Sequence, residues 1–151
     1  MPNTVRALVT GGAGFIGSHL AEALCREGVE VVVLDNLSTG RESNLSWHRT
    51  PHRLEFVQGD IRDGALVRRT VEGCAWVFHQ AAIASVPYSV EHPVETNDQN
   101  LSATLGLLVA AREAGVRRFV FASSSAVYGD GSERVKHEAL APLPLSPYAL
   151  Q

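Results

Sequence analysis

The chain of 151 residues is poor in several residue types, and each shortage excludes a class of protein. It has only two cysteines, Cys25 and Cys74, whose separation matches no metal-ligating motif. We therefore predict two reduced core thiols in a cytoplasmic protein, with no metal site. Lys136 is the single lysine, arginine carries the other positive charges, and the net charge is −3 at pH 7. No basic surface is expected to attract nucleic acid or an anionic membrane.

Long apolar runs are also missing, so neither a signal peptide nor a membrane span is predicted. The apolar fraction of 45% and the charged fraction of 19% are typical of a globular protein. A chain of this length is expected to form one domain with a core of its own.

A glycine-rich turn lies near the start of the chain, where residues 10–17 read Thr-Gly-Gly-Ala-Gly-Phe-Ile-Gly. The apolar residues 5–9 predict a buried parallel strand, and residues 18–25 have helical spacing. A second strand is predicted at residues 30–35, ending in Asp35. Glycines let the backbone lie against a pyrophosphate at a helix N-terminus, and a carboxylate can bind ribose hydroxyls. Together these features predict a dinucleotide site; the alternative is a tight turn that binds nothing.

Within this pattern, the glycines predicted to contact the cofactor are Gly11, Gly14 and Gly17. The carboxylate of Asp35 would repel the 2′-phosphate of NADP, so NAD is the predicted cofactor. Arg41 lies close in sequence and is the one signal in favour of NADP.

Strand and helix signals alternate along the rest of the chain. Residues 36–53 predict a polar loop with a short helical piece. Strands are predicted at residues 54–57, 75–79 and 118–122, and helices at 63–72, with Asp63 as N-cap, and at 93–113, ended by Gly115. This alternation is typical of an α/β, doubly wound (Rossmann) fold with a mostly parallel sheet in the order 3-2-1-4-5.

Residues 129–147 predict a long polar loop, and Ser146-Pro147-Tyr148 predicts the start of a helix. A loop of about eighteen residues is uncommon inside a compact domain. We therefore expect an active-site loop, in a chain that is truncated after the first turn of this helix.

Six motifs occur along the chain, at residues 10–20, 35–40, 59–63, 79–82, 123–129 and 146–148. They resemble, in order, those of the NAD-dependent epimerase/dehydratase family of extended short-chain dehydrogenase/reductases, which act on nucleotide sugars. The resemblance covers essentially the whole chain. It implies that residues 1–151 form the NAD-binding domain, and that the last strands and a C-terminal nucleotide-sugar domain lie outside it.

The resemblance also implies cofactor contacts. Backbone groups of Phe15 and Ile16 would bind the pyrophosphate. The Asp60 carboxylate would accept a hydrogen bond from the exocyclic amine of adenine, assisted by the Ile61 backbone. The other implied contacts are Asp35, Asn36, Leu37, Ser38, Thr39 and Gly40 around the adenosine ribose, Gln80, Ala81 and Ala82 beneath the nicotinamide ribose, and Gln99 and Tyr148. Asp60 could instead be a turn or capping acid, and Gln99 a solvated helix residue.

The implied chemistry is a transient oxidation. Tyr148, as a phenolate, would take a proton from a sugar hydroxyl while hydride passes to the nicotinamide, and Ser124 would align that oxygen. A phenol with a pKa near 10 is a poor base at neutral pH, and the family's helper is a lysine at the position after Gln151. Tyr148 could instead be an exposed aromatic residue without a catalytic role. Ser124 could instead be a strand-end hydroxyl that binds local backbone groups, in which case Ser123 or Ser125 would align the sugar oxygen. His79, which ends a predicted strand, is expected to be a hydrogen-bonded structural residue.

Within the family, Ser125-Ala126 replaces the Asp-Glu pair of the dehydratases, which favours epimerisation or redox chemistry. Residues 81–89 look most like the UDP-hexose and UDP-N-acetylhexosamine 4-epimerases, and Ala84, Ser85 and Val86 would approach the sugar. The predicted function is a 4-epimerase that is homodimeric at full length. The alternatives are a nucleotide-sugar oxidoreductase or decarboxylase, and an incomplete NAD-binding fragment. The 151-residue polypeptide alone is expected to bind NAD weakly or not at all.

Overall fold

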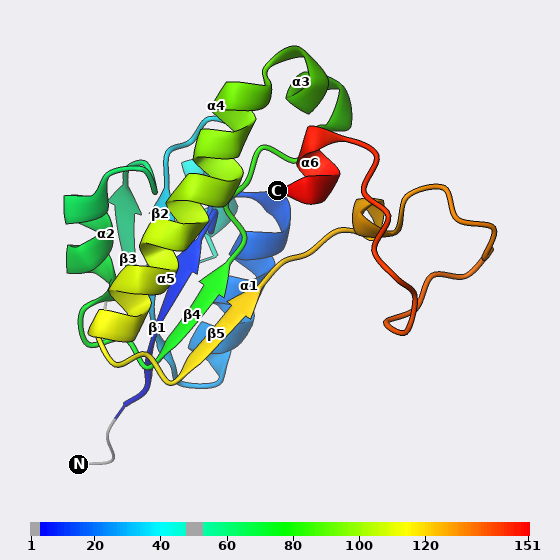
Figure 1. The fold of residues 1–151 in the computed structure, drawn as a ribbon. Helices are drawn as coiled ribbons and strands as arrows, with labels where there is room; N and C mark the ends of the chain where they lie inside the picture. The colour runs from blue at the N-terminus through cyan, green and yellow to red at the C-terminus, as the bar shows by residue number, and fades with distance from the viewer. Residues whose placement is uncertain (1–3, 48–52) are drawn as a thin grey trace.

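The computed structural model describes residues 4–47 and 53–151, which fold around one sheet of five parallel strands (Figure 1). The strands are β1 Arg6–Thr10, β2 Glu30–Asp35, β3 Leu54–Gln58, β4 Trp76–His79 and β5 Arg118–Phe121. They lie in the order β3-β2-β1-β4-β5, which confirms the predicted topology. The chain builds outward from β1 in both directions, so a crevice is expected where β1 and β4 end.

Helices cover both faces of the sheet. They are α1 Phe15–Arg26, α2 Gly64–Val71, α3 Val86–Glu91, α4 Pro93–Asn97, α5 Ala103–Glu113 and α6 Pro147–Leu150, with a π-helical turn, η2, at Asp98–Ser102 and 3₁₀ turns η1 at Glu42–Leu45 and η3 at Ser125–Tyr128. In Figure 1, α2 and α5 lie in front of the sheet and α1 lies behind it. This three-layer arrangement is that of a doubly wound fold.

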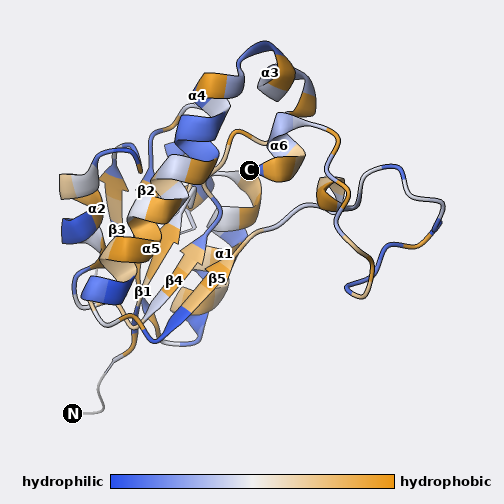
Figure 2. Cartoon of the chain, viewed as in Figure 1, coloured by the Kyte–Doolittle hydropathy of each residue, from blue (hydrophilic) through white to orange (hydrophobic). Residues whose placement is uncertain are grey.

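Alternating side chains of the strands divide the core into two halves. Leu8 of β1 packs toward α2 and α5, where Val67 and Leu107 are buried with it. Its neighbours Ala7 and Val9 point to the other face, toward Ala21 of α1. The central strands β1 and β2 are buried on both faces and are nearly continuous hydrophobic segments, whereas the edge strand β5 is largely exposed although Figure 2 colours most of it as hydrophobic.

Several predicted helix ends are confirmed. Asp63 is the N-cap of α2, and its Oδ1 accepts hydrogen bonds from the first amides of that helix. Gly115, with φ of +72°, follows α5 as predicted, and Gly28, with φ of +83°, follows α1 in the same way. Ser146 caps α6 by accepting a hydrogen bond from the Ala149 amide. Of the two free cysteines, Cys74 is buried and Cys25 half-buried.

Two predictions need correction, and one helix was not predicted. Helix α1 begins at Phe15, inside the stretch that was predicted as a turn. The predicted helix 93–113 is not uniform, because the π-helical turn η2 separates α4 from α5. The short helix α3 was not predicted, although Ser85 caps it and Pro87 lies in its first turn. The predicted loop 36–53 contains η1, and its residues 48–52 lie outside the described residues.

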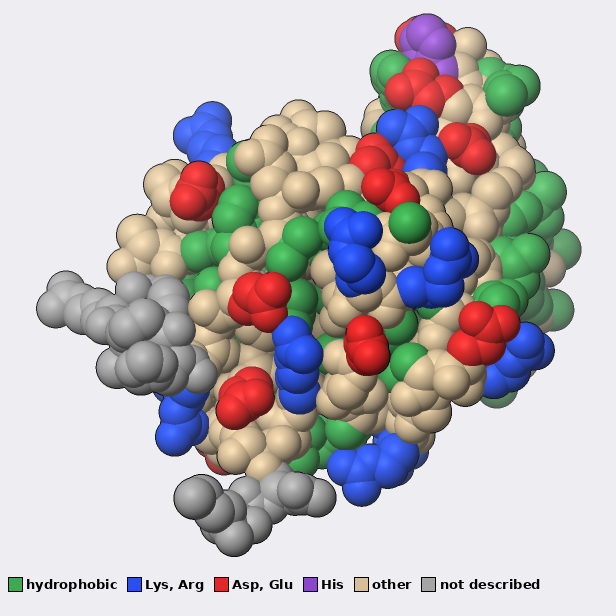
Figure 3. Space-filling view, turned by 90° about the vertical axis from the view of Figure 1, so that its left-hand side faces the viewer, with side chains coloured by type: hydrophobic (Ala, Val, Ile, Leu, Met, Phe, Trp, Pro, Cys, Tyr) green, Lys and Arg blue, Asp and Glu red, His purple; other side chains and the backbone are tan. Residues whose placement is uncertain are grey.

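Charges of both signs are mixed across the face drawn in Figure 3, while hydrophobic side chains gather along its right-hand edge. No helix in residues 4–47 and 53–151 is both long enough and apolar enough to cross a membrane.

Candidate functional site

Two cavities open beside the carboxyl ends of the strands, and residues 80–82 line both of them. The larger, of about 480 Å³, lies between the glycine-rich turn, the loops after β2 and β3, α3 and the π-helical turn. The smaller, of about 240 Å³, lies between the end of β5, α5 and α6. A long ligand could therefore extend from one cavity into the other past the shared segment, at the switch point of the sheet.

The glycine-rich turn is packed so closely that side chains are excluded from it. Gly11 has φ of +66°, and a Cβ there would lie 2.7 Å from the backbone nitrogen of Ala81. A Cβ on Gly17 would lie 2.2 Å from the carbonyl oxygen of Gly11. Real Cβ atoms do not approach backbone atoms so closely, so both positions require glycine. The turn thereby brings the N-terminus of α1 to the sheet edge, next to residues 80–82.

The N-terminus of α1 has the features of an anion site. Its N-cap, Gly14, provides no side-chain hydrogen bond, and its first turn contains no acidic residue. The first amides of a helix have no intrahelical partners, and the helix dipole favours negative charge there. Phe15 and Ile16, the first two residues of the helix, are exposed. A phosphate group is the ligand that such a terminus suits.

Asp35 joins the glycine-rich turn to the loop after β2. It is buried, and its Oδ2 accepts a hydrogen bond of 2.9 Å from the Ala13 amide. Its Oδ1 accepts one of 2.8 Å from the amide of Leu37, a residue with φ of +60°. Each carboxylate oxygen can accept a further bond. Because Asp35 also lines the larger cavity, it can bind hydroxyl groups of a ligand there.

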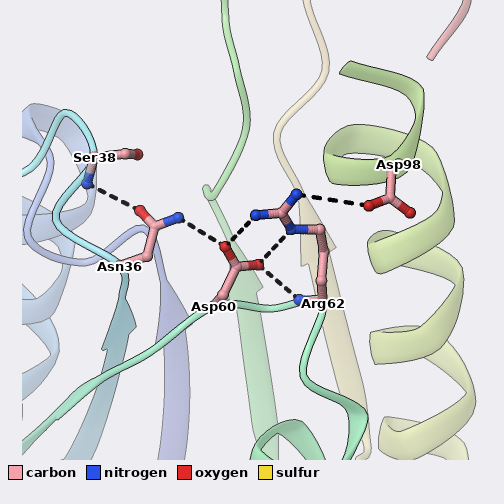
Figure 4. A network of polar contacts seen from close by, with 5 residues as sticks. All are labelled: Asn36, Ser38, Asp60, Arg62 and Asp98. Carbon is pink, nitrogen blue, oxygen red and sulfur yellow. Dashed lines mark hydrogen bonds and ion pairs between the residues drawn. The ribbon is translucent and has the colours of Figure 1, made fainter. Parts of the chain in front are cut away.

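A second acidic residue, Asp60, lies in a polar network after β3 (Figure 4). Its Oδ1 accepts hydrogen bonds from the backbone nitrogen and Nε of Arg62, and its Oδ2 from Arg62 Nη2 and Asn36 Nδ2. Mainly through the side-chain hydrogen bonds of Arg62, this network lowers the pKa of Asp60 to about 2. Arg62 Nη1 also lies 3.6 Å from Asp98 Oδ2 in the π-helical turn.

Ser124 and Tyr148 line the smaller cavity together with residues 80–82. Ser124 follows β5 and caps η3, where its Oγ accepts a hydrogen bond of 3.2 Å from the Ala126 amide. The hydroxyl hydrogen can therefore still be donated to a ligand. Tyr148 lies in the first turn of α6, and its backbone nitrogen donates to Ser89 Oγ of α3 over 3.1 Å. The two predicted catalytic residues thus line one cavity.

His79, at the end of β4, is buried in a chain of hydrogen bonds. The Ala81 amide donates to Thr10 Oγ1, which lies 2.6 Å from His79 Nδ1. On the other side, His79 Nε2 lies 2.7 Å from Thr104 Oγ1, which donates its own hydrogen to the Asn100 carbonyl. Thr104 must then accept from Nε2–H, and the Thr10 hydroxyl can donate to Nδ1 when the ring is neutral. Burial lowers the pKa of His79 to about 4, which agrees with the structural role predicted for it.

The π-helical turn directs two consecutive side chains inward. Gln99 and Asn100 are both buried; Gln99 lines the larger cavity and Asn100 the smaller. Asn100 Oδ1 accepts from the Ile83 amide over 2.8 Å, and its Nδ2 donates to the Ile83 carbonyl and to Gln151 Oε1. The turn therefore holds the segment after β4 against both cavities.

The structure brings most of the predicted residues to these cavities. The predicted residues that line the larger one are Gly11, Gly14, Asp35, Asn36, Ser38, Thr39, Ile61, Gln80, Ala81, Ala82, Ser85 and Gln99. The predicted residues that line neither cavity are Phe15, Ile16, Gly17, Leu37, Gly40, Asp60, Ala84 and Val86. The solvated position considered for Gln99 is wrong, since its side chain is buried.

Several lining residues were not predicted as site residues, among them Arg62, Tyr88 and Glu95 in the larger cavity and Asn100 and Thr104 in the smaller. Tyr88 and Glu95 also contact each other, through a hydrogen bond of 2.9 Å. Arg62 could have been predicted from the sequence, since it lies within the motif at residues 59–63. Tyr88 and Asn100 lie in α3 and the π-helical turn, which were not predicted, whereas Glu95 and Thr104 lie within the predicted helix 93–113.

Comparison with known proteins places the chain among enzymes of one family. A model of the NAD dependent epimerase/dehydratase family matches residues 7–151. A UDP-glucose 4-epimerase of Streptomyces lividans is 42% identical over 144 residues, which are 93% of this chain and 42% of that protein.

Solved structures agree. UDP-glucose 4-epimerase from Brucella ovis, in complex with NAD, has a TM-score of 0.88 and 40% identity over 97% of this chain and 44% of its own. UDP-N-acetylglucosamine 4-epimerase from Methanobrevibacter ruminantium, in complex with UDP-N-acetylmuramic acid, has a TM-score of 0.88 and 39% identity. The match covers 97% of this chain and 46% of that protein's chain. The chain thus spans less than half the length of each of these three proteins.

Proposed function

The chain belongs to the NAD dependent epimerase/dehydratase family, and on that basis we propose that it is the NAD-binding part of a nucleotide-sugar 4-epimerase. One observation carries the proposal. The N-cap of a helix N-terminus suited to phosphate lines the larger of two adjoining cavities, and Ser124 and Tyr148 line the smaller. A dinucleotide in this place would bring its nicotinamide to the two hydroxyls. The relatives described above are 4-epimerases, one of them bound to NAD.

The chain's own groups fit NAD. The uncapped amides of α1 would bind the pyrophosphate, and Asp35 would accept hydrogen bonds from the adenosine ribose. Its carboxylate would repel a 2′-phosphate, which supports NAD rather than NADP. Ala81 and Ala82 line both cavities, and their small side chains would leave room for the nicotinamide ribose.

Catalysis would use the hydroxyls of the smaller cavity. Tyr148 would take the proton of the sugar 4-hydroxyl, and Ser124 would donate its remaining hydrogen to the same oxygen and hold it in place. Bound NAD would supply the redox chemistry, by accepting a hydride from carbon 4 and returning it to the other face of the resulting ketone. Of the three residues that the resemblance assigns to the approach of the sugar, Ser85 lines the larger cavity, whereas Ala84 and Val86 line neither.

The proposed substrate is a UDP-hexose or its N-acetylated counterpart, because the relatives are named for these sugars. A nucleotide-sugar oxidoreductase or decarboxylase is the second candidate, since it would use the same base. Ser125 and Ala126 follow Ser124, so no acid adjoins it to support elimination of water. Because the chain spans less than half of these relatives, we assign the whole reaction to a protein of their length, in which residues 1–151 form the cofactor-binding domain.

Substitution of the proposed base tests this function. In the protein of family length, Tyr148→Phe should lower kcat for interconversion of UDP-glucose and UDP-galactose by about 10²- to 10⁴-fold, because only the phenolic oxygen is removed. Bound NAD should stay near the wild-type amount. Tyr128→Phe is the matched control, since Tyr128 lines neither cavity. Wild-type activity in Tyr148→Phe would refute the assignment of the base, and a wild-type protein without NAD would refute the proposed function.

A further inference from the structure

Two buried hydroxyl groups outside both cavities contact the segment that carries Tyr148. They belong to Ser89 in α3 and Thr96 in α4, and neither residue is exposed to solvent. Neither lines the larger or the smaller cavity. Figure 1 shows α3, α4 and α6 at the same end of the molecule, and α6 packs against both of the other helices. The proposed reaction uses neither hydroxyl directly.

The two hydroxyls share one pattern of hydrogen bonds. Ser89 Oγ donates to the Val86 carbonyl over 2.7 Å, within α3. Thr96 Oγ1 donates toward the carbonyls of His92 and Pro93, which lie 3.1 and 3.2 Å away. A hydroxyl has one hydrogen to donate and two lone pairs with which to accept. Each oxygen can therefore still accept a hydrogen bond from a neighbouring helix.

Helix α6 and the residue that follows it supply the two donors. The Tyr148 amide donates to Ser89 Oγ over 3.1 Å, and Gln151 Nε2 donates to Thr96 Oγ1 over 3.1 Å. Asn100 Nδ2 donates in turn to Gln151 Oε1 over 3.1 Å. Because Tyr148 and Gln151 lie three residues apart, these contacts hold α6 at both of its ends.

The Tyr148 amide depends on Ser89 because of its place in the helix. The first amides of a helix have no intrahelical partner. Within α6, Pro147 has no N–H group, and the Ser146 side chain accepts from the Ala149 amide. Ser89 Oγ therefore acts as a cap that α3 supplies to α6. It binds the backbone of the very residue that bears the phenol.

We propose that Ser89 and Thr96 are positioning residues for the reaction, which hold the Tyr148 phenol at the smaller cavity through the backbone of α6. The inference rests on the proposed function, in which Tyr148 is the base. A displacement of a reacting group by about 1 Å can cost about 10²-fold in rate. Loss of either hydroxyl should therefore lower the rate of the chemical step, although neither touches a ligand.

Variants of the two hydroxyls test this in the protein of family length. Ser89→Ala and Thr96→Val remove the acceptors, whereas Thr96→Ser keeps one. Thr70→Val is the matched control, because Thr70 is buried and its hydroxyl donates in the same way to carbonyls of α2, its own helix. For each protein, kcat, KM for UDP-glucose and the amount of bound NAD would be measured, with thermal unfolding as the check on folding.

Ser89→Ala should lower kcat about 10- to 100-fold, and Thr96→Val, whose contact lies farther from the phenol, about 3- to 10-fold. KM and bound NAD should stay within about twofold of wild type, because the cavities themselves are unchanged. Thr96→Ser should recover most of the wild-type kcat, and Thr70→Val should match wild type.

Combination with Tyr148→Phe separates positioning from general damage. If Ser89 acts through the phenol, Ser89→Ala should change the residual rate of Tyr148→Phe by less than about twofold, because residues that act as a unit are not additive. This residual rate would be followed at high enzyme concentration. An equal loss of rate in both backgrounds would overturn the inference.

Wild-type kcat in folded Ser89→Ala and Thr96→Val would also overturn the inference and would leave the proposed function intact. If Ser89→Ala does not fold, equal kcat values for Thr96→Val and Thr96→Ser would have the same meaning. Wild-type activity in Tyr148→Phe, or no epimerisation by the folded, NAD-loaded wild type, would overturn the proposed function and this inference with it.

Discussion

At the scale of single residues, His79 shows how the fold selects one protonation state. The ring accepts from Thr10 and donates to Thr104, and both threonines have further partners. A proton on Nδ1 would charge a buried ring. Burial accordingly lowers the pKa of His79 to about 4, from an ordinary value of 6.5.

This shift predicts a pH-dependent stability. Below about pH 6.5 the unfolded chain binds a proton at His79, whereas the folded chain stays neutral down to about pH 4. The free energy of unfolding should therefore be fully retained above pH 6.5 and fall as the pH drops from 6.5 to about 4, by at most about 1.4 kcal/mol per pH unit. Chemical denaturation across this range measures it. His79→Gln should flatten the dependence, and the exposed His137→Gln should keep it. An unchanged slope in His79→Gln would contradict the account.

Residue identities alone located the glycine-rich turn, because Gly11 and Gly17 are needed at fixed distances from a strand and an acid. They also placed Ser124 and Tyr148 by family resemblance, and the structure brings these two into one cavity. The hydrogen-bond partners of Asp60 could not be predicted from the sequence in the same way. Its bonds to Arg62 follow from a tight local turn, and its bond to Asn36 joins loops 24 residues apart in sequence.

At the scale of elements, the glycine-rich turn and α1 act as one unit. A Cβ on Gly17 would meet the carbonyl oxygen of Gly11 at 2.2 Å, so Gly17→Ala must push the helix away from the turn. We expect a loss of about 1–3 kcal/mol in stability and loss of NAD binding, measured by thermal unfolding and calorimetry. Gly106→Ala is the matched control, since nothing lies within 4 Å of a Cβ there and alanine should stabilise α5 by about 0.5–1 kcal/mol. Tight NAD binding by Gly17→Ala would show that the turn does not hold the phosphates.

Elements with clear end signals were predicted well, because caps and glycines act locally: Asp63 begins α2 and Gly115 follows α5. The π-helical turn could not be predicted from periodicity. It replaces regular α-helical spacing at Gln99 and Asn100, and its partners, such as Ile83 and Gln151, come from other segments. Such turns occur often at functional sites, and this one contributes lining residues to both cavities.

At the scale of the whole molecule, α4, the π-helical turn and α5 carry an exposed apolar face. It consists of Val94, Leu101, Leu105, Leu108 and Val109. A monomer rarely leaves such a face uncovered, so we propose that two copies of the protein associate through it.

A charged residue in the middle of this face should prevent the association. In the protein of family length, Leu105→Glu should convert a dimer to a monomer in analytical ultracentrifugation, because its carboxylate would be buried in the interface. Leu143→Glu, on the exposed loop after η3, is the control and should leave the dimer intact. A wild-type protein that is monomeric at high micromolar concentration would contradict the proposal.

The central claim is that the two adjoining cavities support a transient oxidation at carbon 4 of a nucleotide sugar. UDP-galactose deuterated at carbon 4 tests it most directly, with the protein of family length and product analysis by mass spectrometry and NMR. The account predicts UDP-glucose that retains the deuterium at carbon 4, because the hydride leaves and returns within one site. Conversion with loss of the label to water would contradict it, as would no conversion by folded, NAD-loaded protein.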